Sequence, residues 1–442
     1  MSTARDIIHQ FREIQALELF TSALCPLNCR YCYIPKCSAM ANIHNDIIQN
    51  TLTNEQTRIV KEKFPNLRTI SLWGAEPTVS LENLLPKLKK FAESINKLDS
   101  ITFSTNFVNI KPIKHLLKVF EDIDIELKIQ ISLDGPDFIT DYNRAPGLTK
   151  RILENIDELI DFAKQLEFKR KPLIHFKSTI TTENMRYMLN RNLIEEYFSF
   201  WDELFSSIKE KESNMAFILK CYPTLEVPGR YTKLDGETFA NFLKQVHSIG
   251  QHSDYTFRLI RLVQFSKNLY ARHHEFTCSA MDSNLGLDGL TVHPCHRTFF
   301  LDRQEYLDAI LRMDAYQNWD VSLLDKGLID AANKNFVVPI KDNDFSRFAY
   351  LGRAYHDFFR FRVSITSAII HEMALAGEVG KYYLRLPELR ELLSIFLHAA
   401  VGCPVESILN SGSIHLPILS LIRLFGNGAF IEVIKDAVNT LG

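Results

Sequence analysis

The chain contains the run Leu24-Cys25-Pro26-Leu27-Asn28-Cys29-Arg30-Tyr31-Cys32-Tyr33, in which three cysteines have the spacing C-x3-C-x2-C. The run follows Leu17–Ala23, an apolar stretch that predicts the first strand of the fold. Three thiolates within eight residues can bind three irons of a cubic iron–sulfur cluster, whereas a cluster used only for electron transfer normally takes four. The spacing therefore predicts a cluster that keeps one iron open to a further ligand.

Zinc is the alternative metal for such a group of cysteines. Zinc sites usually take paired C-x2-C units with a fourth Cys or His nearby. Only Cys37 and His44 stand close enough in sequence to supply that fourth ligand. The ligand count and spacing favour the iron–sulfur cluster.

The composition excludes several classes of protein. With 442 residues, 46% hydrophobic and 24% charged, the chain is long enough for one large domain and a smaller one. A net charge of −2 gives no long-range field for a nucleic-acid backbone, so no nucleic-acid partner is expected. No apolar run reaches the roughly 18 residues of a membrane span, and Met1–Gln15 lacks a signal peptide's apolar centre. We expect a cytoplasmic protein without a membrane partner, whose clustered cysteines bind metal rather than pair as disulfides.

From residue 17 to about 225, short apolar runs alternate with longer amphipathic segments. The segment Arg151–Leu166, for example, has apolar residues at helical spacing. The predicted strands are Leu17–Ala23, Thr69–Trp73, Ile101–Thr105, Leu127–Leu133, Leu173–Ile180 and Ala216–Lys220. Six βα units in a row predict an α/β fold with a parallel sheet, specifically a partial (β/α)6 TIM barrel. In such barrels the chemistry lies on the loops after the strands, which is where the cysteine run stands.

The cysteine motif resembles that of the radical SAM superfamily, with Tyr31 at the family's aromatic position before the third cysteine. The resemblance implies two cofactors, a 4Fe-4S cluster and S-adenosylmethionine (AdoMet), whose amino and carboxylate groups bind the open iron. It also implies that the reduced cluster cleaves AdoMet to a 5′-deoxyadenosyl radical, which abstracts hydrogen from an unactivated carbon. An electron donor such as flavodoxin or ferredoxin is the implied partner.

The ends of the second and third strands carry further elements of this resemblance. The run Trp73-Gly74-Ala75-Glu76-Pro77 resembles the family's Gly-Gly-Glu-Pro segment, with Ala75 in place of the second glycine. The resemblance implies that Gly74 and Glu76 contact the cofactor, and that Glu76 accepts a hydrogen bond from its ammonium group. Asn106, which follows the third strand, is expected to contact the cofactor as well.

The end of the fourth strand identifies a group within the family. The run Ser132-Leu133-Asp134-Gly135-Pro136, followed by Arg144, resembles the SPASM and twitch enzymes. In that group the serine reaches the ribose and the arginine pairs bidentately with the methionine carboxylate. Ser132, Asp134 and Arg144 are therefore expected to bind the cofactor. The run from Lys177 to Asn184 resembles the fifth strand of the same group.

The second half of the chain contains a predicted hairpin, with Asp288-Gly289 as its turn between apolar runs. Cys278 and Cys295 flank it, as in the hairpin that opens a SPASM or twitch domain and binds an auxiliary iron–sulfur cluster. Cys403 or Cys221 would complete the ligand set. The alternative is a vestigial hairpin with buried free thiols.

Cys221 ends the sixth predicted strand, and three roles are compatible with that position. Its thiol could donate a hydrogen atom to a substrate radical, as in the peptide epimerases of the superfamily. It could instead bind the auxiliary cluster, or only pack in the core. From about residue 305 the sequence is predicted to be helical. The expected domains are a barrel (1–235), a twitch-like segment (236–304) and a helical C-terminal region (305–442).

The expected function is that of a radical SAM enzyme that modifies a peptide or protein side chain by maturation, crosslinking or epimerisation. A small-molecule dehydrogenase or epimerase, acting for example on a sugar, is the alternative enzyme. An iron–sulfur redox sensor or cluster carrier is the non-enzymatic alternative. Glu76, Ser132 and Arg144 favour an enzyme, because a protein that only carries clusters needs no cofactor contacts.

Overall fold

The computed structural model describes residues 14–32, 34, 38–223, 238, 241, 242, 245, 283–293, 296, 299, 338 and 339, of which 219–223, 338 and 339 are described by their backbone alone. Several predictions lie outside this part of the chain. They concern Cys37, Cys278, Cys295, Cys403 and all but two residues of the region 305–442.

The predicted alternation of strands and helices is confirmed. The first six strands are β1 (Ala16–Ser22), β2 (Thr69–Gly74), β3 (Ser100–Thr105), β4 (Glu126–Ser132), β5 (Leu173–Ile180) and β6 (Ala216–Pro223). The helices are α2 (Met40–Asn50), α3 (Asn54–Lys63), α4 (Thr78–Ser94), α5 (Lys111–Phe120), α6 (Asp137–Asn143), α7 (Leu148–Ala163), α8 (Thr182–Arg191) and α9 (Ile194–Glu210). Helix α7 begins three residues before the predicted segment, directly after Gly147, whose φ is +73°.

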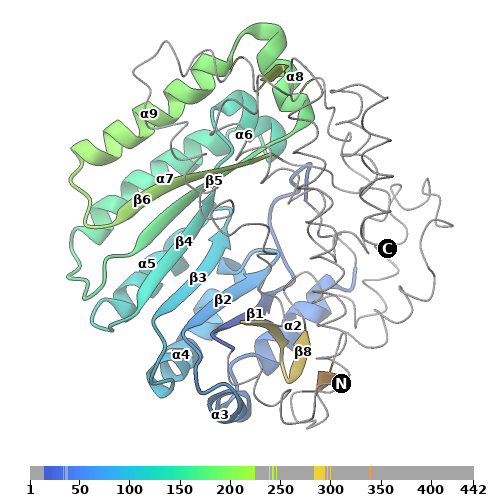
Figure 1. Ribbon diagram of the computed structural model, residues 1–442, viewed down its shortest axis with the longest axis vertical. Helices are drawn as coiled ribbons and strands as arrows, with labels where there is room; N and C mark the ends of the chain where they lie inside the picture. The colour runs from blue at the N-terminus through green and yellow to red at the C-terminus, as the bar shows by residue number, and fades with distance from the viewer. Residues whose placement is uncertain are drawn as a thin grey trace, which may run out of the picture.

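The strand order is that of a partial barrel. Strands β1 to β6 are parallel and lie side by side in chain order. In a doubly wound sheet the strand order reverses at one point. Here each strand from β2 to β6 lies next to the strand before it, always on the same side. Figure 1 shows the strands as a twisted fan with α4, α5 and α7 along one side. The predicted α/β fold with a partial (β/α)6 barrel is confirmed.

The two faces of the sheet differ in polarity. In β4 and β5 the buried residues alternate with partly exposed ones. Ile129 and Phe176 belong to the buried face, which forms one hydrophobic core with the helices. The other face carries Lys128, Gln130 and Lys177, all partly exposed. Because this inner face is polar, the strands can surround a ligand. An apolar inner face would instead be filled by packed side chains.

The predicted hairpin at Asp288-Gly289 is confirmed, with strands β7 (Asn284–Asp288) and β8 (Thr291–His293). Gly289 has φ +55° in the turn, a conformation that suits glycine. Strand β7 also pairs in parallel with β1, and β9 (Val338–Pro339) pairs with β8. The hairpin therefore extends the barrel sheet beyond β1, which the sequence did not predict.

Glu18, on the inner face of β1, connects this second part of the chain to the barrel. Its carboxylate accepts hydrogen bonds from the His296 backbone N–H at 2.5 Å and from Nδ1 of the same residue at 2.9 Å. The imidazole stacks on Trp73, with ring centroids 3.6 Å apart. Burial alone would raise the pKa of Glu18, but His296 and the Asn284 side chain outweigh burial and lower it. Glu18 is thus ionised at neutral pH and fixes His296 on the barrel.

None of the helices in the described ranges combines the length and the apolar character needed to span a bilayer.

Glu18→Gln is expected to lower the free energy of unfolding at pH 7 by about 1.5–3 kcal/mol, because it removes the charge from two hydrogen bonds. The folded-state pKa of Glu18 lies below its ordinary value of 4.5, so its contribution is complete above pH 4.5 and is lost as pH falls through the lower value. Urea unfolding at several pH values tests this. The difference between wild type and variant should shrink in acid, and a difference that grows there would contradict the assignment.

Glu62→Gln is the matched control, because Glu62 pairs with Arg58 only on the surface, where its side chain is 70% exposed. Exposed pairs of this kind contribute about 0–1 kcal/mol.

Candidate functional site

The loops after β1 to β4 bring most of the predicted site residues together. Because these strands are parallel neighbours, their C-terminal ends meet at one edge of the sheet. The cysteine loop follows β1 at this edge. One of its sulfurs, in Cys25, accepts a hydrogen bond from Asn106, and the Cys29 sulfur accepts one from Arg144. The structure thus places the loop between groups from other strand ends.

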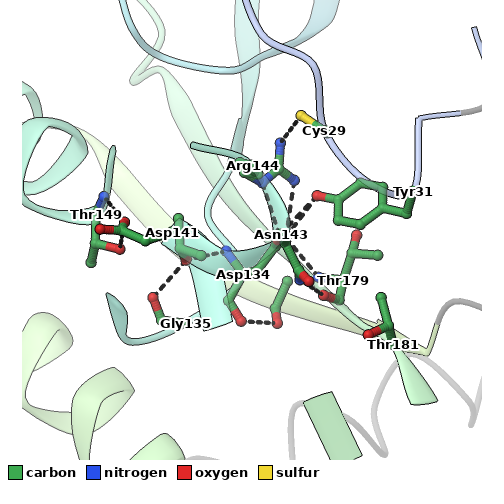
Figure 2. A network of polar contacts seen from close by, with 12 residues as sticks. Cys29, Tyr31, Asp134, Gly135, Asp141, Asn143, Arg144, Thr149, Thr179 and Thr181 are labelled. Carbon is green, nitrogen blue, oxygen red and sulfur yellow. Dashed lines mark hydrogen bonds and ion pairs between the residues drawn. The ribbon is translucent and has the colours of Figure 1, made fainter. Parts of the chain in front are cut away.

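Asp134, just after β4, is the centre of a buried polar network (Figure 2). The Arg144 guanidinium donates to both carboxylate oxygens, from Nε and from Nη2, at 2.9 Å each. The Tyr31 hydroxyl lies 2.9 and 3.0 Å from the same two oxygens. Asn143 Nδ2 and the Thr179 backbone N–H complete the set at 3.2 and 3.0 Å. The Asp134 side chain is 0% exposed, so all contacts of its carboxylate are internal to the protein.

Arg144 has one terminal nitrogen directed away from Asp134. Nη1 lies 4.0 Å from Cys29 Sγ, and the guanidinium also lies over the Tyr31 ring, 5.1 Å from its centroid. Burial opposes the charge on Arg144, but Asp134, Tyr31 and Cys29 together outweigh burial and hold the pKa of the guanidinium well above its ordinary value. The cation is thus fixed between a carboxylate and a cysteine of the motif.

The backbone around Asp134 is itself fixed by neighbouring elements. Its carbonyl accepts a hydrogen bond from Ser178 Oγ on β5, which also bonds the Tyr197 hydroxyl of α9 at 2.7 Å. Its N–H donates to Thr140 Oγ1 on α6. The next residue, Gly135, has φ +136°, and a Cβ there would lie 2.6 Å from the Tyr197 ring. Glycine is needed because the chain passes directly against this ring.

Glu76 forms a second buried group on the other side of the cysteine loop. Its carboxylate accepts hydrogen bonds from the Asn106 N–H at 2.6 Å and from the N–H and hydroxyl of Thr78 at the start of α4. Asn106 Nδ2 in turn lies 3.6 Å from Cys25 Sγ. Burial raises the pKa of Glu76, although these hydrogen bonds oppose it. Among the described side chains, no Lys, Arg or His pairs with this carboxylate.

Gly74 is required by the approach of two strand ends. Its φ is +151°, and a Cβ would lie 2.1 Å from the Ser22 carbonyl oxygen at the end of β1. The N–H of the next residue, Ala75, donates to that same oxygen at 2.8 Å. The approach to Ser22 by itself requires glycine at this position, and the predicted contact of Gly74 with the cofactor stays a prediction.

The three cysteines of the motif differ in exposure. Cys29 is buried, while Cys25 and Cys32 are partly exposed. Burial raises the pKa of the Cys25 thiol to about 11, so a metal that binds it must displace a proton. The backbone also fixes the loop, because the Arg30 N–H donates to the Asn143 carbonyl at 2.8 Å.

A cubic iron–sulfur cluster and a single metal ion make different demands on these ligands. Within the described ranges, no three His, Cys, Asp or Glu side chains converge on one point as ligands of a single ion. His44, the alternative zinc ligand, lies 3.5 Å from Ser22 Oγ. A cubic cluster binds each thiolate at a different iron, so its ligands need not converge. The donor set fits such a cluster, with two N–H groups directed at the sulfurs of Cys25 and Cys29.

Two predicted residues are placed by their strands alone. Ser132 ends β4 on the partly exposed inner face, opposite Lys177 in the register. Cys221 lies in β6 opposite Ser178, but its side chain is outside the described residues. The roles predicted for both stay predictions.

Sequence reasoning missed the residues that support the network. Asn143 bridges Asp134 and the Thr179 carbonyl, and Tyr197 supports Ser178 from α9. The sequence offered one indication, because Asn143 directly precedes Arg144. Nothing in the sequence indicated that Tyr197 lies near the site, because the tertiary packing of α9 brings it there.

No family model and no curated protein matches this chain. A solved structure of native anSMEcpe with bound AdoMet is similar, with a TM-score of 0.43 and 16% identity over 68% of this chain and 82% of that one. For anSMEcpe with AdoMet and the Cp18Cys peptide, the TM-score is 0.41 at 16% identity over 69% and 82%. For Streptococcus suis SuiB bound to precursor peptide SuiA, it is 0.34 at 14% identity over 71% and 68%. With TM-scores below 0.5, the fold assignment rests on this chain's own strand order and register.

Gly74→Ala is expected to lower the free energy of unfolding by more than about 3 kcal/mol, because the added methyl group would overlap a backbone carbonyl. Gly147→Ala is the matched control. Its φ is also positive, at +73°, but nothing lies within 4 Å of an added Cβ, so only about 1–2 kcal/mol of backbone strain is expected. Denaturant unfolding of both variants measures the difference. Equal losses of unfolding free energy in the two variants would show that the backbone shifts to relieve the overlap between the added methyl group and the Ser22 carbonyl.

Proposed function

We propose that this protein is a radical SAM enzyme, and the observation that carries the proposal is a pair of opposite charges on either side of the cysteine loop. The Glu76 carboxylate lies on the Cys25 side and the Arg144 guanidinium on the Cys29 side. An α-amino acid group presents an ammonium and a carboxylate at the same time. A ligand that carries both charges complements this arrangement.

Glu76 supports the ammonium half of this proposal. A buried carboxylate without a cation costs free energy, and the raised pKa of Glu76 reports that cost. An ammonium group would supply the missing charge through a charge-assisted hydrogen bond.

Arg144 supports the carboxylate half, with its Nη1 as the group that is not bonded to Asp134. In the proposal Asp134 does not touch the cofactor. Its carboxylate already accepts hydrogen bonds from donors within the protein, so in the proposal it orients Arg144 and Tyr31.

Cys25, Cys29 and Cys32 would hold the 4Fe-4S cluster, and Asn106 would orient Cys25. The bound cluster and AdoMet supply a 5′-deoxyadenosyl radical that abstracts a hydrogen atom from an unactivated carbon. Ser132 would contact the ribose from the inner face of β4. The inner face, with Lys128, Gln130 and Lys177, would surround the substrate and exclude water.

The substrate class is carried over from the sequence resemblance, as a peptide or protein side chain. In this proposal residues 1–235 form the radical SAM barrel, and 236–304 contribute Cys278 and Cys295 to an auxiliary cluster with Cys403 or Cys221. The region 305–442 forms a helical extension. A flavodoxin or ferredoxin would supply the electron.

Anaerobic reconstitution tests the cluster directly. The wild-type protein is expected to take up iron and sulfide and to give a paramagnetic spectrum that changes when AdoMet is added, because one iron is open. Replacement of Cys25, Cys29 and Cys32 by Ala should abolish that change. Under dithionite the wild type should also release 5′-deoxyadenosine, measured by chromatography. Zinc in the protein as isolated, with no iron uptake, would overturn the proposal.

Glu76→Gln tests the ammonium contact. Loss of one charge-assisted hydrogen bond should cost about 1.5–3 kcal/mol, and hence about ten- to a hundredfold in AdoMet affinity. Glu82→Gln is the matched control on α4, the helix that follows Glu76, because Glu82 is 38% exposed and pairs with His115. Titration of the reconstituted proteins with AdoMet measures both. Equal affinities for the two variants would mean that Glu76 does not bind the ammonium group.

A further inference from the structure

We propose that Asp134 and Arg144 set the reduction potential of the iron–sulfur cluster, with Arg144 as a hydrogen-bond donor to the Cys29 sulfur and Asp134 as the residue that positions it. This inference rests on the proposed function, because it needs the cluster to be present. It goes beyond that function by giving Arg144 a role that is independent of AdoMet.

The contact between Arg144 and Cys29 carries the first half of the inference. Nη1 lies 4.0 Å from Sγ, with the Arg144 side chain 6% exposed. A cluster gains one negative charge when it is reduced. A buried cation and an N–H group directed at one of its sulfurs therefore favour the reduced state, and hydrogen bonds to sulfur raise cluster potentials in general.

The geometry at Asp134 carries the second half. Asp134 accepts from Nε and Nη2 of the same guanidinium, which fixes the plane of the group and leaves only Nη1 for the sulfur. Tyr31 and Asn143 hold the carboxylate from two other directions. A flexible arginine would spend part of its time away from Cys29. Asp134 prevents this, and Figure 2 shows the guanidinium between the carboxylate and the sulfur.

The test compares Arg144→Gln with Arg30→Gln. Both changes remove one guanidinium next to the cysteine motif, but Arg30 is exposed and stacks on Tyr142. Each protein is reconstituted anaerobically, its iron and sulfide are measured, and reduction is titrated by EPR without AdoMet. At a fixed applied potential, Arg144→Gln should lower the ratio of reduced to oxidised cluster about tenfold, a shift of about 59 mV for one electron. Arg30→Gln should leave the ratio unchanged, because solvent screens its charge.

Asp134→Asn separates positioning from charge, because the two effects have opposite signs. Removal of a negative charge would by itself raise the potential. Loss of the hydrogen bonds that position Arg144 would lower the potential, since the amide nitrogen of Asn repels the guanidinium N–H groups whose hydrogen bonds the Asp134 carboxylate accepts. A lowered potential is expected. If Asp134→Asn does not fold, Arg144→Lys replaces it, because lysine keeps the charge but not the fork, and it too should lower the potential.

Three results would overturn the inference while leaving the proposed function intact. These are equal potentials for wild type and Arg144→Gln, a folded Arg144→Gln protein that binds no cluster, and a potential in Asp134→Asn or Arg144→Lys that is unchanged or raised. A wild-type protein that binds no iron–sulfur cluster would overturn both.

Discussion

The buried carboxylate of Asp134 is the interaction on which the arrangement of the site depends. It joins the cysteine loop through Tyr31, the end of α6 through Asn143 and Arg144, and the end of β5 through Thr179. The cysteine loop and the end of β5 are distant from Asp134 in sequence, and the ladder between β4 and β5 ends at Ser132 and Lys177, before Asp134. Without this common acceptor, each of these buried donors would lose a hydrogen bond to a charged group, and a donor left unsatisfied costs about 1–3 kcal/mol. One carboxylate thus fixes the positions of three chain segments relative to the end of β4.

Such a pair is a poor source of net stability. The desolvation of two buried charges offsets most of their attraction, so a buried salt bridge is weak evidence of a stabilising role. What the Asp134–Arg144 pair provides is geometry, because two parallel hydrogen bonds fix the plane of the guanidinium. The Asp134–Arg144 pair lies at the same edge of the sheet as the cysteine loop, and there the fixed guanidinium directs one N–H group at Cys29. A hydrophobic replacement could fill the same volume, but it would not direct an N–H group at Cys29.

The sequence predicted the barrel well because its evidence is local. Alternating apolar residues, as in Leu173–Ile180, define a strand by themselves, and the order of the strands follows from their connections. The pairing of β7 with β1 was not predictable in this way, since the two strands are more than 260 residues apart and no periodicity encodes which edge a hairpin joins. The contact between Glu18 and His296 was unpredictable for the same reason, because the two residues are 278 positions apart in the sequence.

The candidate site was predictable in its membership but not in its internal pairing. Resemblance identified Glu76, Asp134 and Arg144 as a set and predicted that each contacts the cofactor, a role that stays a prediction. It did not predict that the Asp134 carboxylate accepts hydrogen bonds from Tyr31 and Arg144, as it does in the structure. A motif records which residue types stand at strand ends, whereas pairing depends on side-chain direction across strands, which a motif does not contain.

Glu76 and Asp134 illustrate how two buried carboxylates at the same edge of the sheet, after β2 and after β4, come to have different chemistry. Asp134 has a guanidinium within 2.9 Å, whereas Glu76, among the described side chains, has only neutral donors and a raised pKa. An ionised carboxylate with neutral donors alone pays more desolvation than it recovers. Any cation that reaches Glu76 in the folded protein removes part of that penalty and lowers the pKa. By linkage, a cationic ligand then stabilises the folded state as it binds, and its affinity falls where Glu76 becomes protonated. Among the described carboxylates at this edge of the sheet, Glu76 is thus the one that would gain most from a cationic ligand group, because Asp134 already pairs with Arg144.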